Sequence, residues 1–158
     1  MALHGGEPRR GPMLAESRPV FIGRLSYDKI VSTMVKIAQE SANDVKNYKA
    51  LSIDSFFNFV RRVPYRKEQR ETLRAPQRTF VLGGDCDCKT IAVLAWAFIK
   101  GISARVVLAG LSEEPGVFRH VFPELFINGQ WITFDATYDW CEIGKRLSCY
   151  DNFKVYNI

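Results

Sequence analysis

Cys86 is the first residue whose setting suggests chemistry. It lies in the segment GGDCDCKT (83–90), where a glycine-marked turn leads into a long apolar run. A helix starting there would expose the thiol to the positive end of the helix dipole, which favours the thiolate, and its free backbone N–H groups could stabilise an oxyanion. These are the needs of a nucleophilic cysteine. A buried, unreactive cysteine is the usual fate of the residue type, so Cys86 alone does not decide the matter.

A predicted β-hairpin supplies a base and a carboxylate. The Asn-Gly pair at 128–129 is the strongest short signal for a two-residue turn, and it joins apolar stretches near 120–127 and 130–136. Counting outward from this turn places His120 diagonal to Asp135 on one face of the strand pair. That is the geometry of a general base and the carboxylate that orients it.

His120 is also the only histidine available to a folded site. The chain has two histidines, and His4 lies in an aperiodic N-terminal stretch. We therefore predict a catalytic triad of Cys86, His120 and Asp135. Pro123 inside the histidine strand removes a ladder donor, so it could mark an edge or a bulge that changes the register.

The elements that would carry these residues follow from periodicity. Apolar residues recur at helical spacing near 27–41, where Ser26 is a candidate N-cap, and near 52–62, where Pro64 ends the helix. The run from Cys86 to Lys100 is apolar on every side, which is typical of a helix in the middle of a core. A strand near 104–109 and the hairpin follow. Helices followed by an antiparallel sheet predict an α+β fold.

The length and charge of the chain set the domain organisation. We expect one domain at 21–158, preceded by a flexible N-terminal arm at 1–20, because 158 residues suffice for a single core. The net charge of +5 owes much to the basic stretch from Arg61 to Arg78. Such a run is usually a solvated face, although it would also favour an acidic partner. Nucleic acid is not expected there, because aromatic residues are not interleaved.

No stretch of the sequence has the length and apolarity of a signal peptide or a membrane span. We therefore expect no membrane association and a cytoplasmic location, in which the cysteines stay thiols. A zinc site is the competing interpretation of the four cysteines. Their Cys-x-Cys spacing is unlike the usual zinc pairs, so no metal and no cofactor is expected. The cysteines in question are Cys86, Cys88, Cys141 and Cys149.

With these residues in view, the chain resembles the transglutaminase-like superfamily over about residues 74–138. Three segments carry the resemblance in the family's order: Gly84–Gly110, with its Gly-Ile-Ser-Ala-Arg step at 101–105, then HVFPE at 120–124, then WITFDAT at 131–137. The chain departs from the usual pattern at Cys88, Thr90, Ser103 and Pro123. None of these departures removes a member of the triad.

The resemblance implies a papain-like fold, with a buried central helix packed on an antiparallel sheet, in a protein of bacterial or phage type. It also implies cysteine-nucleophile acyl transfer on a peptide or protein amide through a thioester. The Cys86 N–H is then one oxyanion donor, and Gln77 and Tyr65 are candidates for a second. Hydrolysis by a peptidase or amidase is preferred, because water needs no second binding site. Transglutaminase-type cross-linking, or a non-catalytic structural or virion-associated module that keeps the fold, are the alternatives.

Overall fold

The computed structural model describes residues 20–21, 25–67 and 72–158. Residues 1–19 of the arm predicted at 1–20 lie outside these ranges, and Val20 is the first residue of a short strand. The elements follow one another as β1 (Val20–Phe21), α2 (Tyr27–Glu40), the 3-10 helix η1 (Ala42–Tyr48), α3 (Ile53–Arg62), β2 (Thr72–Leu73), α4 (Pro76–Leu82), α5 (Cys86–Lys100), β3 (Ala104–Gly110), β4 (Phe118–Ile127), β5 (Gln130–Thr133) and β6 (Asn152–Asn157).

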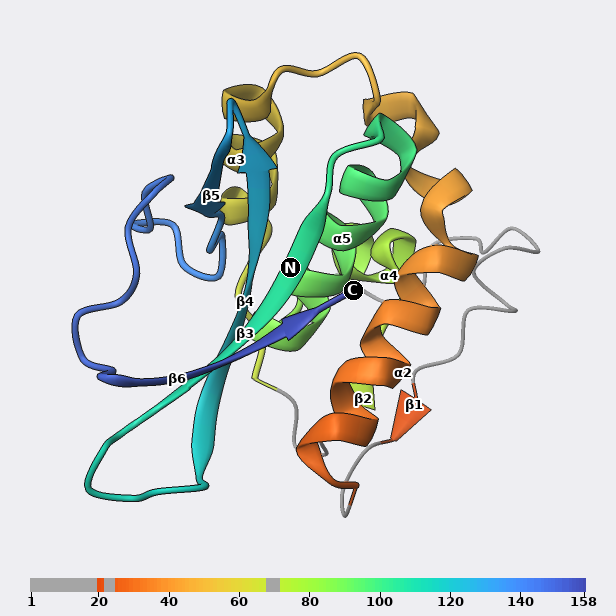
Figure 1. The fold of residues 1–158 in the computed structure, drawn as a ribbon. Helices are drawn as coiled ribbons and strands as arrows, with labels where there is room; N and C mark the ends of the chain where they lie inside the picture. Colours follow the sequence, from red (N-terminus) through yellow and green to blue (C-terminus); the bar gives the residue numbers. More distant parts are fainter. Residues whose placement is uncertain (1–19, 22–24, 68–71) are drawn as a thin grey trace.

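The fold is α+β, with helices packed on an antiparallel sheet, as the sequence predicts (Figure 1). The sheet has the strand order β5-β4-β3-β6, and β1 and β2 form a separate antiparallel pair. The turn at Asn128 and Gly129 sets the predicted hairpin register, with Phe126 opposite Trp131. Both turn residues have positive φ, of 51° and 79°, which explains the Asn-Gly sequence.

Pro123 does not disturb this register. It pairs with Val106 in an unbroken run of the β3–β4 ladder, whose one shift lies farther along, between Ala109 and Gly110. Strand β5 is shorter than predicted, because it ends at Thr133 opposite Glu124. Asp135 therefore lies just past the end of β5.

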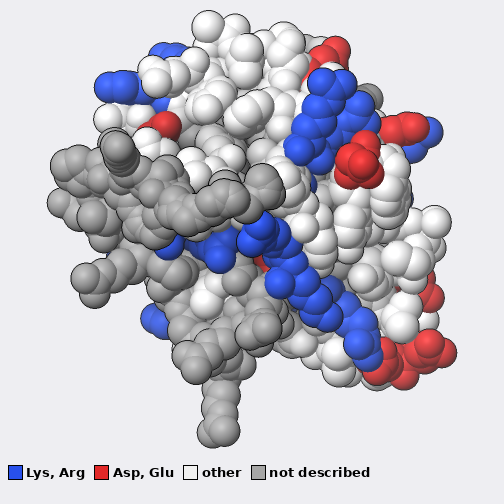
Figure 2. Space-filling model, turned by 180° about the vertical axis from the view of Figure 1, so that it is seen from behind, with Lys and Arg blue, Asp and Glu red and all other residues white. Residues whose placement is uncertain are grey.

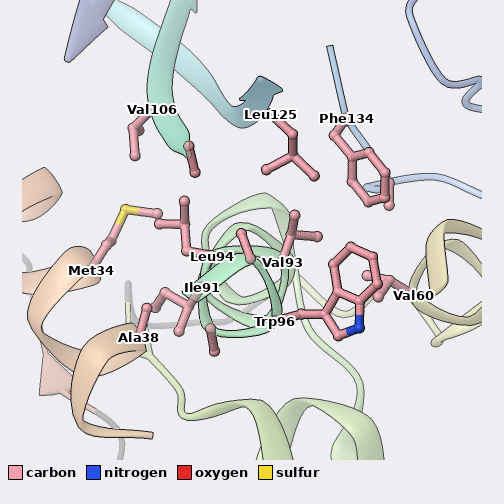
Figure 3. Close-up of a cluster of buried hydrophobic side chains, with 14 of the residues drawn as sticks. Met34, Ala38, Val60, Ile91, Val93, Leu94, Trp96, Val106, Leu125 and Phe134 are labelled. Carbon is pink, nitrogen blue, oxygen red and sulfur yellow. The ribbon is translucent and has the colours of Figure 1, made fainter. Parts of the chain in front are cut away.

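Helix α5 is the centre of the core. Its residues from Cys88 to Ala97 are all buried, and those drawn in Figure 3 point both toward α2, at Met34, and toward the sheet, at Leu125. Local signals set both ends of this helix: the Asp85 side chain accepts a hydrogen bond from the Cys88 backbone N–H, and Gly101 ends the helix in the left-handed conformation.

The other helices surround α5, with α2 along one side and α4 and η1 against it (Figure 1). Ser26 and Ser52 cap α2 and α3 through their side chains, as short polar residues at N-caps do. Helices η1 and α4 were not predicted from the sequence. Pro76 at the first position of α4 is the one local signal that favoured it.

On the face of the sheet away from α5, the covering side chains come from a loop and a strand. A small apolar cluster of Val107, Ala109 and Phe122 lies there under Tyr150 and Phe153, which come from the end of the long loop after β5 and from β6. This loop brings Tyr150 over the sheet near His120. Of the helices in the described ranges, none has the length and apolar character needed to cross a membrane.

Candidate active site

Cys86 is the first residue of α5, as the sequence predicts, and its side chain is half-buried. It lines a cavity of about 430 Å³ together with His120, Tyr65 and apolar side chains of α2 and β4. The walls combine apolar surface with a few convergent polar groups, which is the character of ligand-binding sites. Cys88, two residues along the helix, is fully buried and does not line this cavity.

His120 and Asp135 are in direct contact. His120 Nε2 lies 2.6 Å from Asp135 Oδ2, and the two side chains are 4% and 1% exposed. The other carboxylate oxygen, Oδ1, accepts hydrogen bonds from the backbone N–H and the hydroxyl of Thr137, at 3.1 and 2.6 Å. Thr137 therefore fixes the carboxylate, and the carboxylate leaves Nδ1 as the ring nitrogen that is available to another partner.

The imidazole is also held between aromatic rings. Tyr150 lies 5.6 Å from the His120 ring and almost parallel to it, at 6°, and Phe122 packs at 5.9 Å. A ring held in this way turns little, which keeps the Nε2–Asp135 hydrogen bond in place. No sequence pattern predicted the contact between Tyr150 and His120, because the whole hairpin and the loop after it separate the two residues.

Two contacts with the residue after His120 connect the helix that starts at Cys86 to the strand that carries His120. Thr90, one turn along α5 from Cys86, donates its hydroxyl hydrogen bond to the Val121 carbonyl at 3.4 Å. The Val121 backbone also hydrogen-bonds the Cys86 sulfur. These contacts keep the first turns of α5 against the strand that carries His120, and they give a role to Thr90.

The electrostatics around Cys86 differ from the expectation for a helix start. Burial raises the pKa of the Cys86 thiol well above its ordinary value, the Asp87 and Asp85 carboxylates raise it further, and the Val121 hydrogen bond only partly offsets them. The Asp87 carboxylate lies 3.8 Å from the sulfur. Burial and the two flanking carboxylates therefore favour the neutral thiol of Cys86.

The two candidates for an oxyanion donor lie in different places. Tyr65 lines the cavity, and its neighbours Pro64 and Arg66 hydrogen-bond the backbone of Gly84, at the entry to α5. Burial, and then Tyr138 and Cys86, raise the pKa of the Tyr65 phenol, which therefore stays protonated and able to donate. Gln77 lies on α4 and is not among the residues that line the cavity. Of the two candidates, Tyr65 therefore lines the cavity and Gln77 does not.

Lys89 is a buried cation that sequence reasoning missed, because it interrupts an apolar run. Its ammonium donates to the carbonyls of Val63 and Thr137, at 2.6 and 2.8 Å, and to that of Arg61 at 3.5 Å. Burial lowers the pKa of Lys89 to about 8. Lys89 thus connects the end of α3 and helix α5 to Thr137, the residue that holds the carboxylate of Asp135.

The basic stretch is in part structural. Arg61 and Arg74 donate to backbone carbonyls, whereas Arg62, Arg66 and Lys67 are exposed. Figure 2 shows lysine and arginine side chains in a band across the back of the molecule, next to residues that are not described. An acidic partner on this face stays a prediction.

The zinc interpretation requires a cluster of ligands around the cysteines. Within the ranges that the structure covers, no group of three or more His, Cys, Asp or Glu side chains is placed to hold a metal ion. All four cysteines are free thiols, with Cys88 and Cys141 buried and Cys149 exposed. The zinc alternative therefore finds no cluster of ligands in this part of the chain.

Comparison with known proteins gives one structural likeness. No family model matches the chain, and no curated protein matches it. A crystal structure described as a "putative cysteine protease from Cytophaga hutchinsonii" matches with a TM-score of 0.45 and 19% sequence identity. The match covers 78% of this chain and 50% of the other, so this chain spans half the length of that protein.

Proposed function

We propose that this chain is a cysteine-nucleophile amide hydrolase, a peptidase or amidase that acts through a thioester. The observation that carries the proposal is the buried 2.6 Å pair of His120 and Asp135, because His120 lines the same cavity as Cys86 at the start of α5. Nucleophile, base and orienting carboxylate in one site make up the general pattern of covalent amide hydrolysis.

The proposed reaction begins from the neutral thiol. His120 Nδ1 takes the Cys86 proton as the sulfur attacks the amide carbonyl carbon, and Asp135 stabilises the imidazolium through Nε2–H. The tetrahedral oxyanion forms at the first turn of α5, where the Cys86 backbone N–H has no partner within the helix and the Tyr65 phenol is the second donor.

Collapse of the tetrahedral intermediate breaks the C–N bond, and His120 returns the proton to the leaving amine. This leaves a thioester on Cys86. Water then attacks the thioester with His120 again acting as base, which releases a carboxylic acid and restores the thiol. Attack by an amine in place of water would give transamidation, and water requires no second binding site.

The test combines peptide cleavage with trapping of the acyl-enzyme. A pool of internally quenched peptides is incubated with the protein, with and without an added primary amine, and Cys86 is monitored by mass spectrometry. We expect cleavage and a Cys86-linked acyl group, both absent in Cys86→Ala. Cys149→Ala is the matched control, because that thiol is exposed and distant in sequence from the triad, and it should cleave like the unsubstituted protein.

Asp135→Asn tests the orienting role directly. With the amide oxygen on the Thr137 donors, the Asn NH₂ would point at His120 Nε2 and force the proton onto Nδ1. His120 could then no longer accept the thiol proton, and cleavage should fall by about 10² to 10⁴, the range for loss of general-base catalysis. Unchanged cleavage in a folded Asp135→Asn or His120→Ala variant would refute the triad, and an amine-containing product would replace hydrolysis by transamidation.

A further inference from the structure

Three aromatic side chains form a ladder that begins in the candidate active site. Tyr65 lines the cavity with Cys86, the ring of Tyr138 lies 5.0 Å from that of Tyr65, and the ring of Trp140 lies 5.1 Å from that of Tyr138. The last two rings are nearly parallel, at 4°. We call Tyr65, Tyr138 and Trp140 the aromatic ladder.

The ladder is exposed and yet fixed. Trp140 is 63% exposed and Tyr65 is 43% exposed. The backbone on both sides of Trp140 is nevertheless held, because the Arg61 guanidinium donates to the carbonyls of Asp139 and Cys141, at 3.1 and 3.2 Å. Exposed aromatic residues beside a catalytic cleft, already ordered before a ligand arrives, are the pattern of a binding surface, since little conformational entropy remains to be lost.

Building on the proposed hydrolase function, we propose that the aromatic ladder binds the peptide substrate on one side of the scissile amide, by stacking with an aromatic or proline ring. Two ring-to-ring steps of about 5 Å match the length of about three residues of extended chain, at about 3.3 Å per residue. Because Tyr65 belongs to both the cavity and the ladder, a chain lying on the ladder leads directly to Cys86.

The polar atoms of the ladder favour a peptide over a sugar chain. A stacked sugar ring needs both donors and acceptors for its hydroxyl groups, whereas the side chain at the exposed end of the ladder, Trp140, offers a single N–H donor and no acceptor. Because one face of Trp140 stacks on Tyr138, the exposed remainder of the Trp140 ring is an apolar surface that suits an apolar ring. The bond to be cleaved, an amide, also belongs to a peptide.

The cleavage test uses internally quenched heptapeptides that differ at a single position, occupied by Phe, Pro, Leu or Gly. We expect Phe or Pro to be preferred about tenfold at one fixed distance from the cleaved bond. Trp140→Ala should lower kcat/KM for the Phe or Pro peptide about tenfold more than for the Gly peptide. Equal losses for both peptides, or an unchanged preference, would overturn the proposal.

The control is Trp131→Ala. Trp131 is another partly exposed tryptophan, but it lies opposite Phe126 near the hairpin turn, about 20 Å along β4 from His120 at the rise of an antiparallel strand. We expect this variant to cleave both peptides like the unsubstituted protein.

A binding test separates the ladder from catalysis. In a Cys86→Ser, Trp131→Phe protein, the exposed Trp140 reports binding through a change in tryptophan emission, and the buried Trp96 gives a constant background. A change with the Phe heptapeptide that does not occur with the matched Gly heptapeptide supports the ladder, even if no peptide is cleaved and the proposed hydrolase function fails. If the tryptophan emission changes with chitohexaose but with no peptide, the proposal is overturned. It is also overturned if the emission changes with neither ligand.

Discussion

Asp87 should control the reactivity of Cys86. Its carboxylate lies 3.8 Å from the sulfur and is the largest contribution after burial to the raised pKa of the thiol. Asp87→Asn removes this charge and keeps the size of the side chain. Coulomb's law at 3.8 Å gives about 4 kcal/mol at an effective dielectric constant of 20 and about 1 kcal/mol at 80, so the thiol pKa should fall by about 1 to 3 units.

The sign follows from the charge. Ionisation of the thiol creates a second negative charge beside Asp87, so removing the carboxylate favours the thiolate and moves the onset of reactivity to lower pH. The assay is the rate of iodoacetamide alkylation between about pH 5.5 and 10, with the modified residue identified by mass spectrometry. All variants carry Cys149→Ser, which removes the exposed thiol from the reaction.

Asp54→Asn is the matched control for this experiment. Asp54 is the second residue of α3, as Asp87 is the second residue of α5, so both substitutions remove an acid from the first turn of a helix. Asp54→Asn should leave the alkylation profile of Cys86 unchanged. A midpoint that stays in place or rises in Asp87→Asn would refute the view that the Asp87 carboxylate raises the pKa of Cys86.

Three further predictions concern stability and selectivity. Trp96→Ala should cost about 3 to 5 kcal/mol in urea unfolding, because a fully buried ring that stacks on Phe56 is lost, and a loss below about 1 kcal/mol would contradict the central place of α5. For Lys89, the folded protein releases its proton near pH 8 and the unfolded chain near 10.5, so the unfolded chain binds more protons between these values and stability rises with pH. The free energy of unfolding of the unsubstituted protein, measured relative to that of Lys89→Met, should therefore increase by up to about 3 kcal/mol from pH 8 to pH 10.5. A difference between the two proteins that does not change with pH would show that burial of the Lys89 ammonium does not lower stability. At limiting iodoacetamide, Cys86 should be alkylated before the fully buried Cys88, and the reverse order would overturn the assignment of the nucleophile.

Local sequence signals were sufficient to predict those features that depend on interactions between residues close together in the sequence. Helix α5 begins at Cys86 because Asp85 caps it, and it ends at Gly101 because glycine adopts a positive φ without strain. The Asn-Gly turn set the hairpin register in the same way, and that register brought His120 and Asp135 to one place. Each of these outcomes depends on residues a few positions apart, or on counting outward from a turn.

Sequence reasoning failed on the ionisation of Cys86, although both acids are visible in the motif. A helix start by itself favours a thiolate, and the balance changes only when burial and the 3.8 Å approach of Asp87 are known. The ionisation state is the small difference between opposing electrostatic effects, and each depends on distance and on solvent access. Neither quantity can be counted along the chain.

The sequence by itself determined α2, α3, α5, β3 and the β4–β5 hairpin, because caps, turns and periodicity act over a few residues. It also determined that Cys86 starts a helix and that His120 lies close to Asp135. Only the tertiary structure decided that α5 is joined to the histidine strand by Thr90 at Val121, and that Tyr150 stacks on His120. It also decided that Trp140 stands exposed beside the site. These contacts join segments that are far apart in the chain, and they form only when the packing of the whole core fixes where each segment lies.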